Sequence, residues 1–352
     1  MQTRAYNKFW QQIHKSAKEK GSLLRVMFEL TYRCNFKCRH CYVPESFREK
    51  RELKTKEVFS ILDQLADIGC FYLGFTGGEP FMRKDIIQIL CYAKKKGVEI
   101  IIYSNGSLID EIIARELAQL KPNKVDITLP AMTEAAFEKI TCSPGSYKKV
   151  FKAIGLLHKN KVNLGFKTCV LKENEAQIED IQDFAESLGA LHRLDTRLSP
   201  RLDGSKEPFR YRGSLKNKLQ ATGYRLQAIR KDNFKECDLV ATKQIPDSNN
   251  LFKCAVGVSQ AAINPFGELK MCLMIDFPKY KILKTSLKDA WQRLKGLVSS
   301  IKQDKNYKCD RCNLAPFCKW CPGRAWLYNK TFTSCEPESR IFAKKIKQGL
   351  NC

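Results

Sequence analysis

The sequence predicts an α/β protein, with a parallel sheet of six β/α units followed by a small cysteine-rich C-terminal domain. Two observations predict this fold class. Short apolar runs alternate with segments of helical apolar spacing between residues 23 and 197, as in parallel sheets with right-handed crossovers. Seven of the 16 cysteines fall in spaced groups between residues 254 and 335, which indicates metal ligation rather than disulfides in a reducing compartment.

Each expected element rests on local patterning. The helix that follows Thr55 has apolar residues at helical spacing, and Gly69 stands at its C-terminal end. The same reasoning predicts strands at 23–30, 71–75, 98–103, 125–129, 162–170 and 191–197. Helices are expected at 55–68, 85–96, 109–120, 134–140, 147–158 and 175–188. Six units are fewer than the eight that close a full β/α barrel.

Four regions are expected along the chain. These are an N-terminal lead-in at 1–22, the β/α region at 23–212, a bridging helix and connector at 213–253, and the cysteine-rich domain at 254–352. The first 24 residues contain no apolar core of a secretory signal, and no run approaches the roughly 20 apolar residues that span a bilayer. We therefore expect a cytoplasmic protein without membrane segments.

Cys34, Cys38 and Cys41 follow the first predicted strand on one short loop. Three thiolates at this spacing can hold three irons of a [4Fe–4S] cube and leave the fourth iron open to a substrate or cofactor. A structural zinc loop and a cluster of free thiols are the alternatives. Zinc requires four ligands in closed geometry, and no partner pair of Cys or His stands nearby.

The motif Gly77-Gly78-Glu79-Pro80 follows the second predicted strand. Together, the Cys-x3-Cys-x2-Cys loop and this motif resemble the radical S-adenosylmethionine (radical SAM) superfamily. The resemblance implies a partial (β/α)6 barrel, a [4Fe–4S] cluster whose open iron binds S-adenosylmethionine, and a 5′-deoxyadenosyl radical that abstracts a substrate hydrogen.

By this resemblance, Gly77, Gly78, Glu79 and Pro80 bind the methionyl end of S-adenosylmethionine. Ser104 and Asn105, at the end of the third strand, are expected to hydrogen-bond its ribose or carboxylate, with a helix-capping turn as the alternative. Thr128 matches a family position near the cofactor carboxylate. All lie at carboxyl ends of strands, where parallel β/α folds carry their chemistry.

The C-terminal cysteines resemble a SPASM domain, which holds up to two auxiliary [4Fe–4S] clusters. The resemblance assigns Cys309, Cys312, Cys318 and Cys335 to a distal cluster, and Cys254, Cys272 and Cys321 to a proximal one. Only five residues separate the two Cys-x2-Cys pairs, whereas a zinc ribbon has about 15–20.

Two departures from the family pattern concern the proximal cluster. The last gap of the four-cysteine group has two residues where the family has three, which makes the partner of Cys321 less certain. Gln260 stands where sulfatase-maturing relatives place a further cysteine. One iron of the proximal cluster is therefore expected to be open to substrate, water or another side chain.

The resemblance implies an oxidoreductase-type radical enzyme that matures a ribosomally made peptide, by a thioether or carbon–carbon crosslink or by dehydrogenation. The net charge of +25 suits a peptide with an acidic leader, and a low-potential flavodoxin or ferredoxin is the expected electron donor. The segment 195–212 is expected either to line the substrate opening or to be a salt-bridged surface loop.

Other functions stay open. Anaerobic sulfatase maturation is disfavoured by Leu273, which occupies the position of that family's Asp base. A small-molecule or tetrapyrrole oxidoreductase is a further alternative. An iron–sulfur electron-transfer protein or a nucleic-acid-binding protein would not need an open iron, and the basic residues form no aromatic-interleaved stripe.

Overall fold

A single sheet of nine strands organises the chain, in the order β6-β5-β4-β3-β2-β1-β7-β8-β9. The computed structural model describes residues 12–213 and 251–349, apart from 14, 18, 253 and 319. Strands β1 to β6 are mutually parallel, which confirms the predicted α/β class. Their bounds are β1 Arg25–Thr31, β2 Tyr72–Gly77, β3 Glu99–Ser104, β4 Lys124–Thr128, β5 Leu164–Cys169 and β6 Leu191–Asp195.

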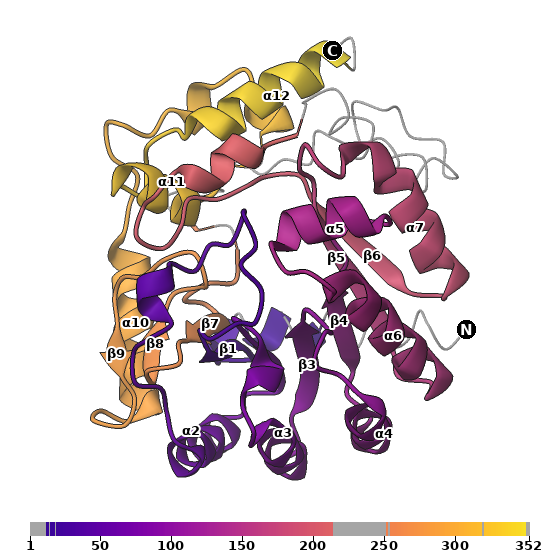
Figure 1. Ribbon diagram of the computed structural model, residues 1–352. Coiled ribbons are helices and arrows are strands. Elements are labelled where there is room, and N and C mark those ends of the chain that lie inside the picture. Colours follow the sequence, from indigo (N-terminus) through magenta and orange to yellow (C-terminus); the bar gives the residue numbers. More distant parts are fainter. Residues whose placement is uncertain are drawn as a thin grey trace.

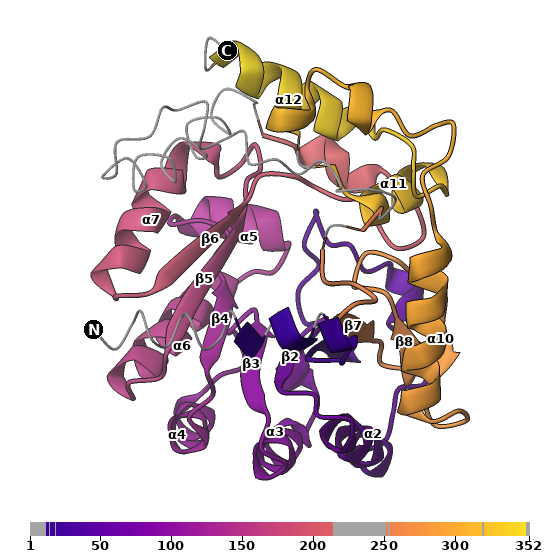
Figure 2. The same cartoon turned by 180° about the vertical axis from the view of Figure 1, so that it is seen from behind.

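Helices follow one another around the outside of the curved sheet (Figures 1 and 2). They pack there through apolar contacts. For example, Val26 and Phe28 of β1 belong to the same buried apolar cluster as Val58 and Ile61 of α2. The bounds are α2 Thr55–Asp67, α3 Ile86–Lys95, α4 Glu111–Leu120, α5 Glu134–Thr141, α6 Ser146–Lys159, α7 Ile178–Ser187 and α10 Leu287–Ser300. Helices α11 Pro322–Asn329 and α12 Pro337–Gly349 lie across one end of the molecule (Figure 1).

Local chemistry sets the helix ends. Helix α4 begins at Glu111, two residues later than expected, because the Asp110 carboxylate caps it by accepting from the Ile113 amide at 2.9 Å. Short 3-10 turns complete the chain: η1 Glu45–Phe47, η2 Pro80–Met82, η3 Glu175–Gln177, η4 Glu207–Tyr211, η5 Cys309–Arg311 and η6 Ala315–Phe317.

The N-terminal lead-in and the connector can be described only in part. The described residues between 12 and 20 are helical, and the predicted connector 213–253 falls largely outside the described residues. The predicted region boundaries stay predictions. Across the described ranges, no helix combines the length and apolar character that a membrane crossing requires.

The C-terminal region adds three strands to the sheet, which the sequence did not predict. Strand β7 (Gln260–Ile263) pairs in parallel with β1, and β8 (Glu268–Lys270) and β9 (Tyr280–Lys281) continue antiparallel. The sheet therefore runs without a break from the β/α region into the residues that precede Cys272.

A buried ion pair joins these two parts of the sheet. Lys270 of β8 lies 2.9 Å from Glu29 of β1, and both side chains have 0% exposed area. The Glu29 carboxylate also accepts from the hydroxyls of Tyr32 (2.9 Å) and Tyr42 (2.8 Å), which flank the cysteine loop. One carboxylate thus holds both ends of that loop and β8.

We expect Lys270→Met to lower the free energy of unfolding by about 3–5 kcal/mol, because it leaves the Glu29 carboxylate buried without a countercharge. Urea unfolding of the metal-free protein, followed by circular dichroism, measures this loss. The control is Lys279→Met, which removes a partly exposed pair with Asp276 at 2.8 Å and should cost less than about 1 kcal/mol. Equal losses in the two variants would contradict the role assigned to Lys270.

Candidate functional site

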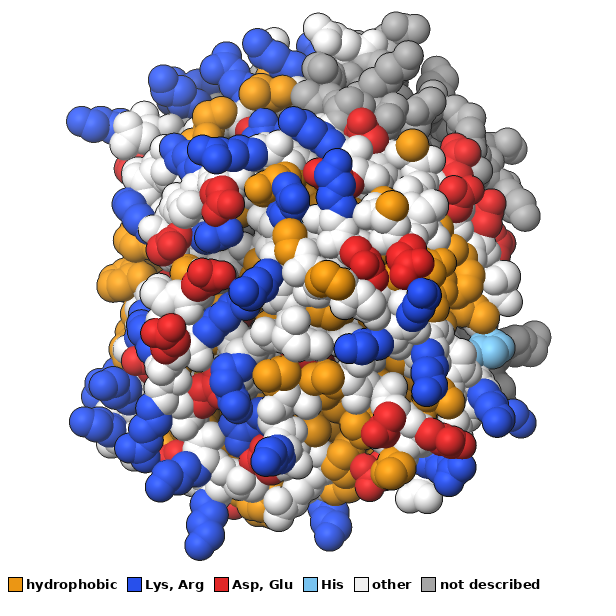
Figure 3. All heavy atoms as spheres, in the orientation of Figure 1, with side chains coloured by type: hydrophobic (Ala, Val, Ile, Leu, Met, Phe, Trp, Pro, Cys, Tyr) orange, Lys and Arg blue, Asp and Glu red, His pale blue; other side chains and the backbone are white. Residues whose placement is uncertain are grey.

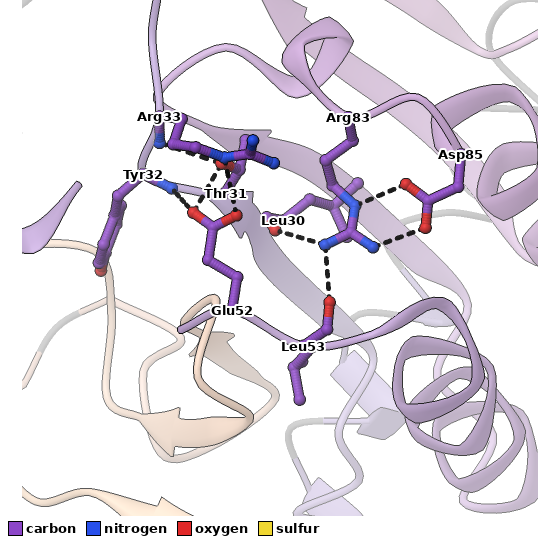
Figure 4. Close-up of polar contacts among 8 residues, drawn as sticks. All are labelled: Leu30, Thr31, Tyr32, Arg33, Glu52, Leu53, Arg83 and Asp85. Atoms are coloured by element: carbon purple, nitrogen blue, oxygen red, sulfur yellow. Dashed lines mark hydrogen bonds and ion pairs between the residues drawn. The ribbon is translucent and has the colours of Figure 1, made fainter. Parts of the chain in front are cut away.

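The cysteine loop begins directly after β1, and its entry is fixed by a carboxylate. Glu52 accepts from the Thr31 hydroxyl (2.7 Å), the Tyr32 amide (2.7 Å) and the Arg33 side chain (3.3 Å), as Figure 4 shows. These contacts orient the backbone that leads into Cys34.

The three thiols of the loop lie close enough to influence one another. Burial, followed by the charges of Cys41 and Cys34, raises the pKa of the Cys38 thiol. Burial also raises the pKa of Cys34 to about 11. The Cys34 sulfur accepts from the Phe36 amide at 3.4 Å and the Asn105 amide group at 3.8 Å. Without metal, the Cys34 and Cys38 thiols are therefore protonated at neutral pH, and binding iron would displace these protons.

The predicted cofactor residues Glu79, Ser104 and Asn105 lie together, with Glu79 beneath the other two. Its carboxylate has no exposed area and accepts from the Ser104 hydroxyl (2.8 Å), the Asn105 amide (2.6 Å) and the Phe81 amide (3.1 Å). Burial raises the pKa of Glu79 to about 7, although the three hydrogen bonds act in the opposite direction and lower it. Glu79 thus sets the turn at the end of β3, and through Asn105 it reaches the Cys34 sulfur.

Gly77 and Gly78 allow the β2 turn to approach the segment entering the cysteine loop. A Cβ on Gly77 would overlap the Thr31 carbonyl, and one on Gly78 would overlap the Arg33 carbonyl. The Gly78 and Glu79 amides donate to these same carbonyls, at 2.7 Å and 2.9 Å. The structure thus explains the glycines by contact between two backbones, while their predicted contact with a ligand stays a prediction.

The other two predicted cofactor residues are placed differently. Pro80 is buried and begins η2, directly after Glu79. Thr128 is half-buried at the end of β4 and pairs with Lys167 of β5. Within the described residues, no hydrogen bond joins Thr128 to Glu79, Ser104 or Asn105.

Four C-terminal cysteines form one electrostatic group. Burial, followed by the charges of Cys318, Cys335 and Cys312, raises the pKa of Cys309 to about 12. These four are the residues predicted for the distal cluster.

The three remaining C-terminal cysteines form a second group. Burial, followed by the charges of Cys321 and Cys254, raises the pKa of Cys272 to about 12. Gln260 is half-buried at the start of β7, and its amide donates to the Ala255 carbonyl. Cys237, a conceivable fourth ligand, lies outside the described residues.

The donor set suits iron–sulfur clusters better than single metal ions. A cavity of about 440 Å³ is lined by six of the C-terminal cysteines, Cys254, Cys309, Cys312, Cys318, Cys321 and Cys335. In the described part of the chain, no three His, Cys, Asp or Glu side chains converge to hold one metal ion. Thiols that surround a space, without meeting at a point, fit clusters in which each thiolate binds a different iron.

Sequence reasoning missed a cysteine and misjudged another. Cys142, at the end of α5, lies near Cys38 and has a φ of 48°. Cys142 follows the cysteine loop by more than 100 residues in the sequence, so its position gave no indication that it would lie near Cys38. Cys70, Cys91 and Cys169 stand outside the spaced groups, so the sequence predicts that they pack in the core as small apolar residues. Cys70 is buried and Cys169 is half-buried, whereas Cys91 is exposed, so the prediction for Cys91 is wrong.

The segment 195–212 contacts both cysteine regions. The Leu202 amide donates to the Tyr42 carbonyl beside the cysteine loop at 2.9 Å. The buried Arg324 of α11 donates to the Arg197 carbonyl at 3.3 Å and lies 4.0 Å from Asp195. The segment therefore contacts both the cysteine loop and α11, whereas a simple surface loop would need neither contact.

Part of the chain is similar to a known protein family. The model of the radical SAM superfamily matches residues 28–185. Fe-coproporphyrin III synthase of Methanosarcina barkeri is 32% identical over 162 residues, which cover 46% of this chain and 40% of that protein. The antilisterial bacteriocin subtilosin biosynthesis protein AlbA of Bacillus subtilis is 26% identical over 317 residues, covering 85% of this chain and 67% of AlbA.

A solved structure shares the fold. Streptococcus suis SuiB bound to S-adenosylmethionine superposes with a TM-score of 0.71 at 18% identity, over 91% of this chain and 78% of SuiB. SuiB has also been solved with its precursor peptide SuiA.

The raised pKa of Glu79 predicts a pH-dependent stability. The folded protein holds the Glu79 proton up to about pH 7, whereas an unfolded Glu loses it near pH 4.5, so the contribution of Glu79 to stability falls between these pH values. Compared with Glu79→Gln, the wild type should lose about 2–3 kcal/mol of unfolding free energy between pH 4.5 and pH 7.5. Urea unfolding of both metal-free proteins at the two pH values measures this. A pH-independent difference would contradict it.

Proposed function

We propose that the chain, whose residues 28–185 match the radical SAM superfamily, is a peptide-modifying enzyme of this superfamily. The observation that carries the proposal is the grouping of its ten spaced cysteines into three sets, one on the β1 loop and two in the C-terminal region. When bound, a [4Fe–4S] cluster and S-adenosylmethionine supply a 5′-deoxyadenosyl radical, which removes a hydrogen atom from a substrate.

Each residue set has a proposed role. Cys34, Cys38 and Cys41 hold the cluster of the β1 loop. The cofactor's methionyl end binds at the turn of Gly77, Gly78, Glu79 and Pro80, where the buried Glu79 acts by positioning Ser104 and Asn105. Thr128 at the end of β4 completes this site.

The C-terminal cysteines are proposed to hold two auxiliary clusters. Cys309, Cys312, Cys318 and Cys335 would bind the distal one, and Cys254, Cys272 and Cys321 the proximal one. We infer that residues 254–352 act as a cluster-binding domain, after the lead-in 1–22, the barrel 23–212 and the connector 213–253. Reduced thiols in such number favour the cytoplasm.

A peptide is the proposed substrate. Support comes from AlbA, a biosynthesis protein of the bacteriocin subtilosin, and from the structure of SuiB with a precursor peptide. The tetrapyrrole alternative is supported by Fe-coproporphyrin III synthase, whose match covers 46% of this chain, and by the AdoMet-dependent heme synthase of Nitratidesulfovibrio vulgaris, which is 23% identical over 89% of this chain. A peptide substrate is preferred because AlbA is 26% identical over 85% of this chain and the SuiB structure with its precursor peptide shares the fold over 94% of it.

Metal content tests the cluster assignment. After anaerobic reconstitution the protein should contain about 12 irons per chain, four for each of three cubes. Replacing Cys34, Cys38 and Cys41 together with Ala should lower this to about eight, abolish 5′-deoxyadenosine formation and leave the auxiliary-cluster absorbance. Cys91→Ala, at an exposed cysteine, is the matched control and should change neither quantity. About four irons in the wild type would refute the auxiliary clusters.

A substrate thiolate is proposed as the missing ligand of the proximal cluster. Adding a Cys-containing substrate peptide should then perturb the electron paramagnetic resonance spectrum of that cluster, and the Cys→Ser peptide should not. The perturbation should grow as pH rises through the pKa of the peptide thiol, because thiolate binds metal. A structure in which a fourth protein side chain binds the proximal cluster would exclude substrate ligation. The proximal cluster would then have a role in electron transfer only.

A further inference from the structure

A hollow of about 460 Å³ opens beside the carboxyl end of β1, between the segment that leads into α2 and the turn η2. It belongs neither to the turn at Glu79 nor to the C-terminal cavity. Its charged lining consists of four cations and two acids: Arg33, Lys50, Arg83, Lys84, Glu52 and Asp85. Figure 4 shows most of these residues.

Both acids are already neutralised by partners inside the protein. Asp85 accepts two hydrogen bonds from Arg83, at 2.9 Å and 2.6 Å, and a third from Thr55 at 2.7 Å. Glu52 pairs with Arg33 at 3.3 Å and also accepts from the Thr31 hydroxyl and the Tyr32 amide, and only 9% of its side chain is exposed.

Of the four cations, the buried Arg83 pairs with Asp85 and Arg33 pairs with Glu52, which leaves Lys50 and Lys84 as the surplus positive charge. Half of the Arg33 side chain is exposed, and Lys50 and Lys84 are exposed residues. The ammonium of Lys50 lies 4.3 Å from the ring centre of Phe47, a contact that leaves its charge uncompensated. The hollow thus presents positive charge, on a chain with 62 Lys and Arg against 37 Asp and Glu. Lys and Arg side chains are also spread over the face in Figure 3.

The position of the hollow points to electron delivery. Arg33 precedes Cys34, and its carbonyl accepts from the Glu79 amide at 2.9 Å. An acidic protein seated in the hollow would therefore lie against the backbone that carries the first loop cysteine. The residues that line the hollow lie between positions 33 and 85, and none of the C-terminal cysteines is among them.

We propose that this hollow docks an acidic one-electron carrier protein. The proposal rests on the function above: the carrier is oxidised by one electron, and the cluster held by Cys34, Cys38 and Cys41 is reduced by one electron. Redox encounters between proteins use small interfaces, and complementary charge sets their association rate. A small hollow that carries the surplus charge of Lys50 and Lys84 meets both requirements.

The test uses reduced flavodoxin and the double variant Lys50→Glu/Lys84→Glu. Its matched control is Lys152→Glu/Lys159→Glu, the same charge change at two exposed lysines of α6. Anaerobic stopped-flow mixing measures the second-order rate constant of cluster reduction, and calorimetry measures the affinity for oxidised flavodoxin. We expect the first variant to lose at least about tenfold in rate at low ionic strength, and most of the difference to vanish at high salt.

The outcomes separate this proposal from the proposed function. Equal losses in both variants, or no loss in either, would overturn the docking site. The docking site would also be overturned if the Lys50→Glu/Lys84→Glu variant kept the wild-type rate of cluster reduction by flavodoxin but bound a synthetic poly-glutamate peptide more weakly. The hollow would then be a site for acidic peptides. Reduction by dithionite bypasses docking, and a failure to form 5′-deoxyadenosine with dithionite would refute the proposed function while the calorimetry still decides the docking.

Discussion

The arrangement of this protein depends on one buried carboxylate. Glu29 pairs with Lys270 and accepts hydrogen bonds from the hydroxyls of Tyr32 and Tyr42. A buried ion pair adds little net stability, but removing one partner is costly, so such a pair selects one arrangement over others. Here the selected arrangement fixes both ends of the cysteine loop relative to β8. Because Cys272 follows Lys270 by two residues, two cysteine sets take their positions from the same carboxylate.

The six parallel strands could be predicted because buried strands are nearly continuous apolar runs, as in residues 98–103. Helix starts were predicted less exactly, since the Asp110 cap places the start of α4 two residues after the predicted position 109. Strands β8 and β9 could not be predicted, since three and two residues carry no periodic signal. Lys270 argues against a buried strand at this position, because lysine is almost never fully buried without a partner. Its partner Glu29 lies 241 positions earlier, so the sequence around Lys270 does not show the pair.

The residues of the candidate site were easier to identify than their roles. Cysteine spacing indicated which thiols belong to the site, whereas the grouping of Cys321 with Cys254 and Cys272 came only from the family resemblance. In the fold, the charges of Cys321 and Cys254 act on the Cys272 thiol. The sequence of Gly77 and Gly78 indicates a close approach without saying to what, and here the partner is the backbone of Thr31 and Arg33. Burial has no local signature either. Glu79 could be expected to face a ligand, whereas its carboxylate lies beneath the turn that it orders.

One electrostatic feature recurs in all three cysteine sets. Each contains a buried thiol with a raised pKa, and each has a cation nearby that acts against this shift: Arg48 lowers the pKa of Cys38, Lys270 that of Cys272, and Arg197 that of Cys318. A buried thiolate is costly unless it is paired, so each cation offsets part of the cost of ionising its set. None of these cations lies within the cysteine motifs themselves; they reach the thiols only once the β1 loop, β8 and the segment after β6 are in place. Ionisation of the thiols, and with it metal binding, is therefore coupled to completion of the fold.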